Sequence, residues 1–283
     1  MTIYLLGAGP ITRFIRNNIL AEGQEVLIVT STQIDVTQVS YFLNYLDFSA
    51  IQLTDNDKII IGWRSMGGGL LGNERNALIS RLTTNLRHAS KIIYLSSGSV
   101  YGNSAEFFEE KMMVNPKTSY AIKKLEVETW LQEINSEKTI ICRISNVFGA
   151  KDLPDLITQI SADLKNKRPI SLFEPDRFTR DYISVDAILS ALQFLLTDYG
   201  SQTPAVEIFN LSSYDPVSTT TILKYFRDFL GYEIPYKTLP IPKSIPTSNC
   251  LNNEKILQIT QMNFLDSGLS LLDYIQTQVA TSV

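Results

Sequence analysis

The order of strand-like and helix-like segments predicts an α/β fold, with a doubly wound parallel sheet and a smaller C-terminal part. Short apolar runs of strand length alternate with helical patterns in the first half of the chain. This alternation is typical of a parallel sheet covered by helices. A glycine-rich turn follows the first apolar run directly, and the alternation loosens after residue 150. We therefore assign residues 1–149 and 179–212 to the sheet domain, and residues 150–178 and 213–283 to the smaller part.

The composition is that of a globular protein and argues against several classes of function. Of the 283 residues, 44% are hydrophobic and 19% are charged, which is enough for a sizeable core. The net charge is −4 and no basic run occurs, so nucleic acid is not expected as a partner. No apolar run is long enough to span a membrane and no signal-peptide pattern precedes the first strand, which predicts a cytoplasmic protein. The chain has one histidine, His88, in a setting that does not suit a Ser-His-Asp hydrolase. Its two cysteines lack the spacing of a metal site.

The first element is a strand over residues 2–6, followed by the turn GAGPIT and a helical pattern. A strand, a glycine turn and a helix form a phosphate cradle, because backbone N–H groups and the helix N-terminus face the anion. Gly7 and Gly9 occupy the first two glycine positions of this pattern, and Thr12 stands at the third. The third position serves helix–strand packing, so a small residue such as Thr12 can be tolerated there.

The second strand, EVLIVT, ends at Thr30 and bears on the choice of cofactor. Sites specific for NAD usually place a carboxylate here for the ribose hydroxyls, and this chain has Thr-Ser-Thr instead. A 2′-phosphate would not be repelled, and Arg13 could neutralise it, which favours NADP or a relaxed preference between NADP and NAD. A solvated Arg13 without such a role is equally compatible with the sequence. Asp35 and Val36 are expected at the end of a third strand, near the adenine.

The fourth strand, residues 58–62, leads into Gly62-Trp63-Arg64 and the glycine run MGGG at 66–69. The glycines predict a mobile loop, and such a loop beside a cofactor site often covers the substrate. We count Arg64 among the candidate substrate-binding residues. A helix is expected over residues 73–90 and a fifth strand over 91–97.

A tyrosine, a lysine and a serine form the candidate catalytic set. Tyr120 and Lys124 lie four residues apart on a predicted helix and share one face. An ammonium near a phenol lowers the pKa of the phenol, so Tyr120 could exchange a proton with a carbonyl or alcohol oxygen. Ser97, at the end of the fifth strand, could hydrogen-bond the same oxygen. Such proton transfer, coupled to reduction or oxidation at the same carbon, needs a hydride carrier. Taken alone, the spacing of Tyr120 and Lys124 would be interpreted as a pair on the surface of a helix.

With these residues in view, the chain resembles the extended short-chain dehydrogenases/reductases of the nucleotide-sugar epimerase/dehydratase/reductase group. The resemblance rests on six blocks in order: GAGPIT at 7–12, SSGSVYG at 96–102, NPKTSYAIKK at 115–124, RISNVFG at 143–149, RDYISVD at 180–186 and FNLSS at 209–213. It implies a Rossmann-type sheet domain, a substrate-binding C-terminal part, a nucleotide-sugar substrate, and NADP or NAD as cofactor. The group includes dimers, so the resemblance leaves a homodimer open.

The resemblance also implies roles for individual residues. Tyr120 would be the acid/base, Lys124 would lower its pKa and hold the nicotinamide ribose, and Ser97 would bind the reacting oxygen. Ile144 falls where the family contacts the nicotinamide. The remaining implied positions, which would bind the substrate, are Ser99, Asn146 and Arg180. Arg180 would bind the nucleotide diphosphate.

Departures from the family pattern narrow the reaction. Dehydratases carry an Asp-Glu pair where this chain has Gly98 and Ser99, and double epimerases carry a cysteine at the position of Ser99 and a later histidine. Two enzyme readings remain open: a reductase of a keto-sugar nucleotide, and an epimerase that keeps NAD tightly bound. The missing ribose carboxylate favours the reductase. A non-catalytic cofactor-binding regulator is the less favoured third reading, because Tyr120 and Lys124 are both retained.

Overall fold

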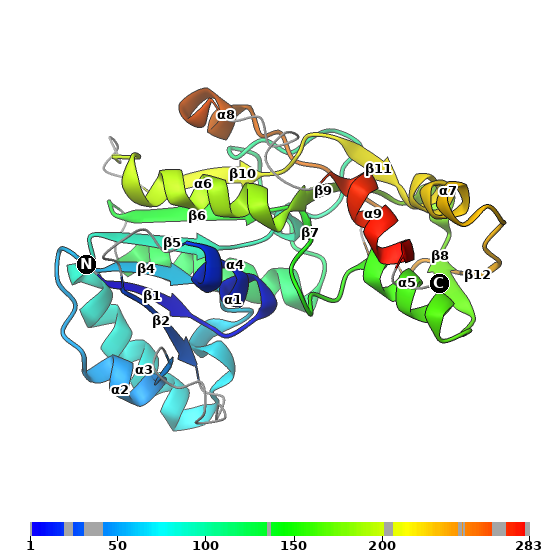
Figure 1. Cartoon of the computed structure of the whole chain (residues 1–283). Helices are drawn as coiled ribbons and strands as arrows, with labels where there is room; N and C mark the ends of the chain where they lie inside the picture. The colour runs from blue at the N-terminus through cyan, green and yellow to red at the C-terminus, as the bar shows by residue number, and fades with distance from the viewer. Residues whose placement is uncertain are drawn as a thin grey trace.

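The computed structural model describes residues 2–19, 25–30, 42–134, 137–200, 206–242, 245, 247–261 and 270–280. A seven-stranded parallel sheet lies at its centre, in the order β10-β6-β5-β4-β1-β2-β3 (Figure 1). The strands are β1 (Thr2–Leu6), β2 (Glu25–Thr30), β3 (Phe42–Asn44), β4 (Lys58–Ile61), β5 (Lys91–Leu95), β6 (Thr139–Ile144) and β10 (Glu207–Leu211). The predicted doubly wound α/β fold is thereby confirmed. Asp35 and Val36 lie outside the described residues.

Helices cover both faces of this sheet, which is why its strands read as apolar runs rather than as alternating patterns. On one face α1 (Pro10–Asn18) and α6 (Val185–Thr197) pack through side chains such as Ile15 and Leu192. On the other face lie α2 (Tyr45–Ala50), α3 (Gly72–Asn85) and α4 (Ser119–Ile134), with Phe48, Leu82 and Val127 in the core (Figure 1). Every residue of β6 is buried, because β5 and β10 flank this strand and helices cover both faces of the sheet.

Some boundaries differ from the sequence predictions. The helix expected over 73–90 ends at Asn85 and continues as a short 3-10 helix, η3 (Leu86–His88). The strand expected over 91–97 ends at Leu95, so Ser97 begins the next turn, the 3-10 helix η4 (Gly98–Tyr101). The glycine run predicted as a loop forms the 3-10 helix η2 (Met66–Gly69).

The smaller part has its own core beside the carboxyl ends of the central strands (Figure 1). One small sheet contains β7 (Asn146–Phe148), β9 (Thr179–Ser184), β11 (Pro216–Ser218) and β13 (Ser248–Asn249), and β8 (Ile170–Phe173) pairs with β12 (Tyr236–Leu239). The helices there are η5 (Pro175–Arg177), α5 (Leu156–Lys165), α7 (Thr219–Leu230) and α9 (Leu271–Ala280), while α8 (Glu254–Thr260) contacts β10. The boundaries predicted for the two domains stay a prediction.

Local sequence signals fix the start of α5, the helix of the smaller part that faces the central sheet. Asp155 caps α5 by accepting the backbone N–H of Thr158 at 2.8 Å, and the Thr158 side chain accepts the backbone N–H of Asp155 at 3.1 Å. This reciprocal capping box satisfies two backbone donors at the start of the helix. The N-terminus of α5 is thereby fixed where it can form a wall of a cleft.

Thr12, at the third position of the glycine turn, is accommodated by a glycine on another strand. A Cβ atom on Gly62, just after β4, would lie 2.5 Å from the Thr12 methyl carbon. The Thr12 hydroxyl donates to the carbonyl of Gly9 at 2.9 Å, which holds the methyl group toward Gly62. The close approach of α1 to the sheet is therefore kept, because the side chain present at Thr12 is compensated by the side chain missing at Gly62.

This exchange predicts the behaviour of two substitutions. Gly62→Ala should lower the free energy of unfolding by about 1–3 kcal/mol, because the added methyl overlaps Thr12. Adding Thr12→Ser removes the Thr12 methyl but keeps its hydroxyl, and should restore most of the loss. Urea unfolding of the wild type, both single variants and the double variant measures this. Equal losses in Gly62→Ala and the double variant would contradict the packing argument.

Candidate active site

A cleft of about 1150 Å³ opens at the carboxyl ends of the central strands. Ligand sites of doubly wound sheets are expected at this edge. The sequence-predicted residues that line the cleft are Gly9, Thr12, Arg64, Ser97, Tyr120, Lys124, Ile144 and Asn146. The opposite wall belongs to the smaller part and includes Asp152, Asp155 and Gln159. Segments far apart in the chain therefore meet in one site.

The glycine turn forms the floor at one end of the cleft. Gly7 has a φ of +112°, a conformation that a side chain strongly disfavours, and its N–H donates to Val29 at 2.8 Å. A Cβ atom on Gly9 would meet nothing within 4 Å, so the backbone there faces open space. Arg13 is exposed on α1 and Thr30 is buried at the end of β2, and neither lines the cleft.

Two predicted substrate contacts lie away from the cleft. Arg180, on β9, donates through Nη1 to the carbonyls of Thr179 at 3.0 Å and Thr247 at 2.6 Å, and its guanidinium lies 4.8 Å from the ring centre of Phe178. Ser99 donates its hydroxyl to Ser97 at 3.0 Å. Neither Arg180 nor Ser99 lines the cleft, so in this structure each supports neighbouring chain.

Tyr120 presents 44% of its surface and lines the cleft. Partial burial of the phenol raises its pKa above the ordinary value, while a hydrogen bond with Ser97 and the charge of Arg64 act in the opposite direction. The direction is opposite to the lowered pKa expected for Tyr120, because desolvation of the phenol outweighs the favourable contributions. The Nζ of Lys124 lies 5.9 Å from the ring centre of Tyr120, and its predicted role toward the phenol stays a prediction.

Lys124 is turned inward, with 4% of its surface exposed. Its Nζ donates to the carbonyl of Trp63 at 2.8 Å and to that of Leu95 at 2.6 Å. Burial lowers the pKa of Lys124 to about 7, although the charge of Glu128 opposes this. Near neutral pH the side chain is therefore poised between its charged and neutral forms.

Trp63 fixes the chain where it leaves β4. The side chain is buried, and its Nε1 donates to the hydroxyl of Tyr45 at 2.6 Å. The indole stacks on Trp130 of α4 with ring centres 6.3 Å apart. The carbonyl of Trp63 also accepts the Tyr94 hydroxyl at 3.3 Å. The backbone that leads to Arg64 is held between two helices and a strand.

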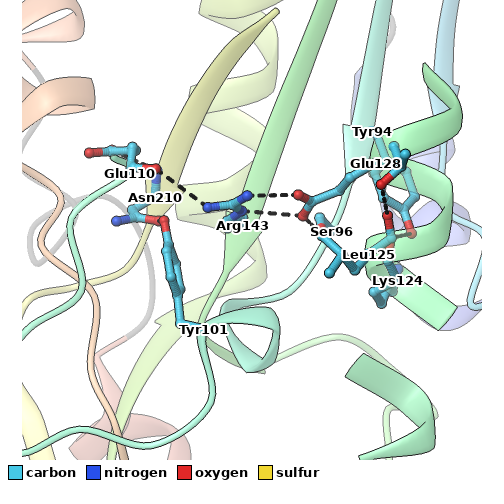
Figure 2. A network of polar contacts seen from close by, with 10 residues as sticks. Tyr94, Ser96, Tyr101, Glu110, Lys124, Leu125, Glu128, Arg143 and Asn210 are labelled. Atoms are coloured by element: carbon cyan, nitrogen blue, oxygen red, sulfur yellow. Dashed lines mark hydrogen bonds and ion pairs between the residues drawn. The ribbon is translucent and has the colours of Figure 1, made fainter. Parts of the chain in front are cut away.

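A buried ion pair lies behind the catalytic candidates (Figure 2). Glu128 of α4 is fully buried. Its carboxylate accepts hydrogen bonds from Nη2 of Arg143 at 2.8 Å and from Nε of Arg143 at 3.2 Å. The hydroxyl of Ser96 also donates to Glu128. This forked contact satisfies the carboxylate in a site closed to water and ties α4 to β6 and the end of β5.

The network continues from Arg143 toward the segment before α4 (Figure 2). The guanidinium lies 4.6 Å from the ring centre of Tyr101, whose hydroxyl donates to Asn210 at 2.9 Å. The backbone N–H of Asn210 donates to the carboxylate of Glu110 at 2.9 Å. Sequence reasoning missed this network. The available signal was Glu128, one helical turn after Lys124 on the same face.

The described residues contain no cluster of three or more metal-ligating side chains. Among the described helices, none has both the length and the apolar character of a membrane span.

Comparison with known proteins agrees with this geometry. Residues 75–212 match the model of the NAD dependent epimerase/dehydratase family. A dTDP-4-dehydro-6-deoxyglucose reductase from Escherichia coli is 31% identical over 146 residues, which cover 47% of this chain and 44% of the relative. An ADP-L-glycero-D-manno-heptose-6-epimerase from Brachyspira hyodysenteriae is 24% identical over 163 residues, or 53% and 50% of the two chains. The chain therefore matches about half the length of these curated relatives.

Among solved structures, the fold is similar over almost the whole chain. UDP-glucuronic acid 4-epimerase from Bacillus cereus, solved in complex with UDP-glucuronic acid and NAD, superposes with a TM-score of 0.77. The match covers 99% of this chain and 98% of the epimerase at 17% sequence identity. At that identity the comparison establishes the fold.

The buried ion pair yields a stability prediction. Arg143→Met should lower the free energy of unfolding by about 3–5 kcal/mol, because it leaves the Glu128 carboxylate buried without its partner. Asp228→Asn removes one partner of the exposed Lys224–Asp228 pair on α7 and should change the unfolding midpoint little. Urea unfolding of both variants makes the comparison. Similar small effects in both would mean that the buried pair does not hold α4 in place.

Proposed function

We propose that this chain, whose residues 75–212 match the model of the NAD dependent epimerase/dehydratase family, is an NAD(P)H-dependent oxidoreductase of nucleotide-linked sugars. The favoured reaction is reduction of a keto-deoxy-sugar nucleotide, with Tyr120 as proton donor. One observation carries the proposal: Ser97, Tyr120 and Lys124 line the same cleft as the glycine turn.

The glycine turn fits a dinucleotide pyrophosphate. Gly7 adopts a left-handed φ, the backbone at Gly9 faces open space, and none of the described side chains caps the N-terminus of α1. Unoccupied backbone N–H groups at a helix N-terminus attract phosphate. Gly9 and Thr12 would hold the pyrophosphate side of the cofactor, and Lys124 and Ile144 the nicotinamide side. When bound, the cofactor supplies the hydride that reduces the carbonyl carbon.

The side chains supply the proton and hold the reacting oxygen. Tyr120 would donate its phenolic proton to the carbonyl oxygen as that carbon is reduced, which yields the new hydroxyl group and a tyrosinate. Ser97 would hydrogen-bond the same oxygen and orient it. Gln159 would offer its amide group to sugar hydroxyls, and Asn146 its amide oxygen, since the Asn146 Nδ2 donates to the carbonyl of Asp181 at 2.9 Å.

Several observations bear on the type of reaction. The similarity to the E. coli reductase supports reduction, as does Thr30 at the end of β2, where NAD sites usually place a carboxylate. Dehydration is disfavoured because Gly98 lacks the acidic side chain of dehydratases, and a Cβ atom there would lie 2.9 Å from Leu251, which would have to shift. An epimerase that retains NAD is the second candidate, supported by the epimerase relative. The three catalytic candidates in one cleft weigh against a non-catalytic regulator.

Replacing the phenol tests the proposed proton donor. Tyr120→Phe should lower kcat roughly 100-fold to 10,000-fold, because no group remains to protonate the product oxygen. Cofactor affinity, measured by fluorescence titration with NADPH, should change little. Tyr232→Phe, at an exposed site outside the cleft, serves as the control. Turnover that survives Tyr120→Phe would exclude this mechanism.

The cofactor state of the purified protein separates the two enzyme readings. For the reductase we expect protein without tightly held cofactor that binds added NADPH or NADH reversibly. The protein is denatured and the supernatant is assayed for both nucleotides in both redox states. Stoichiometric retained NAD would favour the epimerase, because that reaction regenerates its cofactor in each turnover.

A further inference from the structure

A segment of the smaller part, residues 247–253, runs along the turn that carries Ser97, and we call this segment the strap. It contains β13, which pairs in parallel with β9 and places Asn249 opposite Arg180. Four side chains of the strap are buried: Asn249, Cys250, Leu251 and Asn253. The strap therefore contacts β9 of the smaller part on one side and the turn after β5 on the other.

The side chain of Asn249 binds both ends of this turn. Its Nδ2 donates to the carbonyl of Gly98 at 2.9 Å and to the carbonyl of Gly102 at 2.8 Å. Gly98 begins η4 directly after Ser97, and Gly102 caps its end, so one amide group spans the whole 3-10 helix. A Cβ atom on Gly98 would lie 3.0 Å from Oδ1 of Asn249, so the absence of a side chain there permits this close approach.

The hydrogen bonds within the turn are long. Three backbone N–H groups donate to groups inside the turn at 3.2 or 3.3 Å, those of Ser99, Val100 and Gly102. Such bonds are usually about 2.9–3.0 Å long, and a 3-10 helix has the poorer hydrogen-bond geometry of the common helices. The contacts of normal length come from outside the turn: the two from Asn249, and one from the backbone N–H of Asn115 at 2.9 Å. The place of Ser97 therefore depends on these outside donors.

We propose that Asn249 is a positioning residue that holds Ser97 at the wall of the cleft. Asn249 does not line the cleft and acts through the carbonyls at the two ends of the turn. The proposal rests on the proposed function, in which Ser97 orients the carbonyl oxygen of the substrate. Arg180 holds the start of the strap, since its guanidinium donates to the carbonyl of Thr247 at 2.6 Å. The smaller part is thus connected to the catalytic turn through Asn249.

Hydrogen exchange of the turn measures this restraint and needs no substrate. Exchange is followed by mass spectrometry in a peptide that covers residues 96–104, and a peptide that covers β6 reports opening of the whole domain. In Asn249→Ala the turn should exchange about tenfold faster, because two buried carbonyls lose their donor. Asn249→Asp is close in size to the wild type but carries no donor at alkaline pH, and should exchange at least as fast as Asn249→Ala. Either variant suffices if circular dichroism shows that the other does not fold.

Asn253→Ala is the matched control. Asn253 is a buried asparagine of the same strap, but its amide donates to the carbonyl of Ser212 at 2.7 Å and not to the turn. This variant should leave exchange in the turn unchanged.

Kinetics then show whether the effect passes through Ser97. In the reduction of a keto-deoxy-sugar nucleotide by NADPH, Asn249→Ala should lower kcat about tenfold with little change in KM, because the reacting oxygen is less well oriented. Adding Asn249→Ala to Ser97→Ala should cost little more, since the group that Asn249 positions is already missing. Asn253→Ala should keep the wild-type kcat.

Four results would overturn the proposal. They are unchanged exchange of the turn in Asn249→Ala, an equal acceleration in Asn253→Ala, slower exchange in Asn249→Asp than in Asn249→Ala, and a full further loss of kcat when Asn249→Ala is added to Ser97→Ala. The third result would mean that side-chain shape, and not hydrogen bonding, holds the turn. A wild type that reduces no keto-sugar nucleotide would instead remove the proposed function, while the exchange data would still decide whether Asn249 holds the turn.

Discussion

The contact on which the site depends most is the buried ion pair between Glu128 and Arg143. It joins the helix that carries Tyr120 and Lys124 to strand β6 of the seven-stranded sheet, in a region closed to water (Figure 2). A buried carboxylate without its partner is costly, so α4 can neither rotate nor slide without losing both ends of this contact. Since Tyr120, Lys124 and Glu128 are spaced by single helical turns, the orientation of Glu128 also sets that of the two catalytic candidates.

Two cations near this helix are held in different ways. Lys124 faces inward because the carbonyls of Trp63 and Leu95 and the nearby carboxylate of Glu128 receive it there. Arg64 faces the cleft because Trp63, the residue before it, is held by Tyr45 and Trp130. Both side chains line the cleft, Lys124 as a buried group and Arg64 as an exposed one. The positive charge at the site is therefore divided between a titrating group and a permanent one.

Much of the site followed from the sequence because its residues stand at ends of predictable elements. Gly9 follows β1, Ser97 follows β5, and Asn146 follows β6, and the parallel topology brings these ends to one edge. The face of α4 was harder to predict, since its buried side includes Lys124 and Glu128, and a charged residue breaks an apolar pattern. Arg180 shows the limit of motif reasoning: its block is present, but the side chain holds the carbonyl of Thr247 instead of lining the cleft.

The sequence by itself determined the class of fold and the glycine turn, and it singled out Ser97, Tyr120 and Lys124 as candidates that line one cleft, because strand length, turn residues and helical spacing are local properties. Tertiary structure alone decided which residues compensate for one another. Thr12 is tolerated because Gly62 lacks a side chain, and Glu128 is buried because Arg143 meets it. Each of these pairs joins positions separated by many residues. Steric fit and charge pairing between such positions produce no periodic pattern in the sequence. The distinction between an inward Lys124 and an outward Arg64 arises in the same way, from contacts that exist only once the strands and helices have packed.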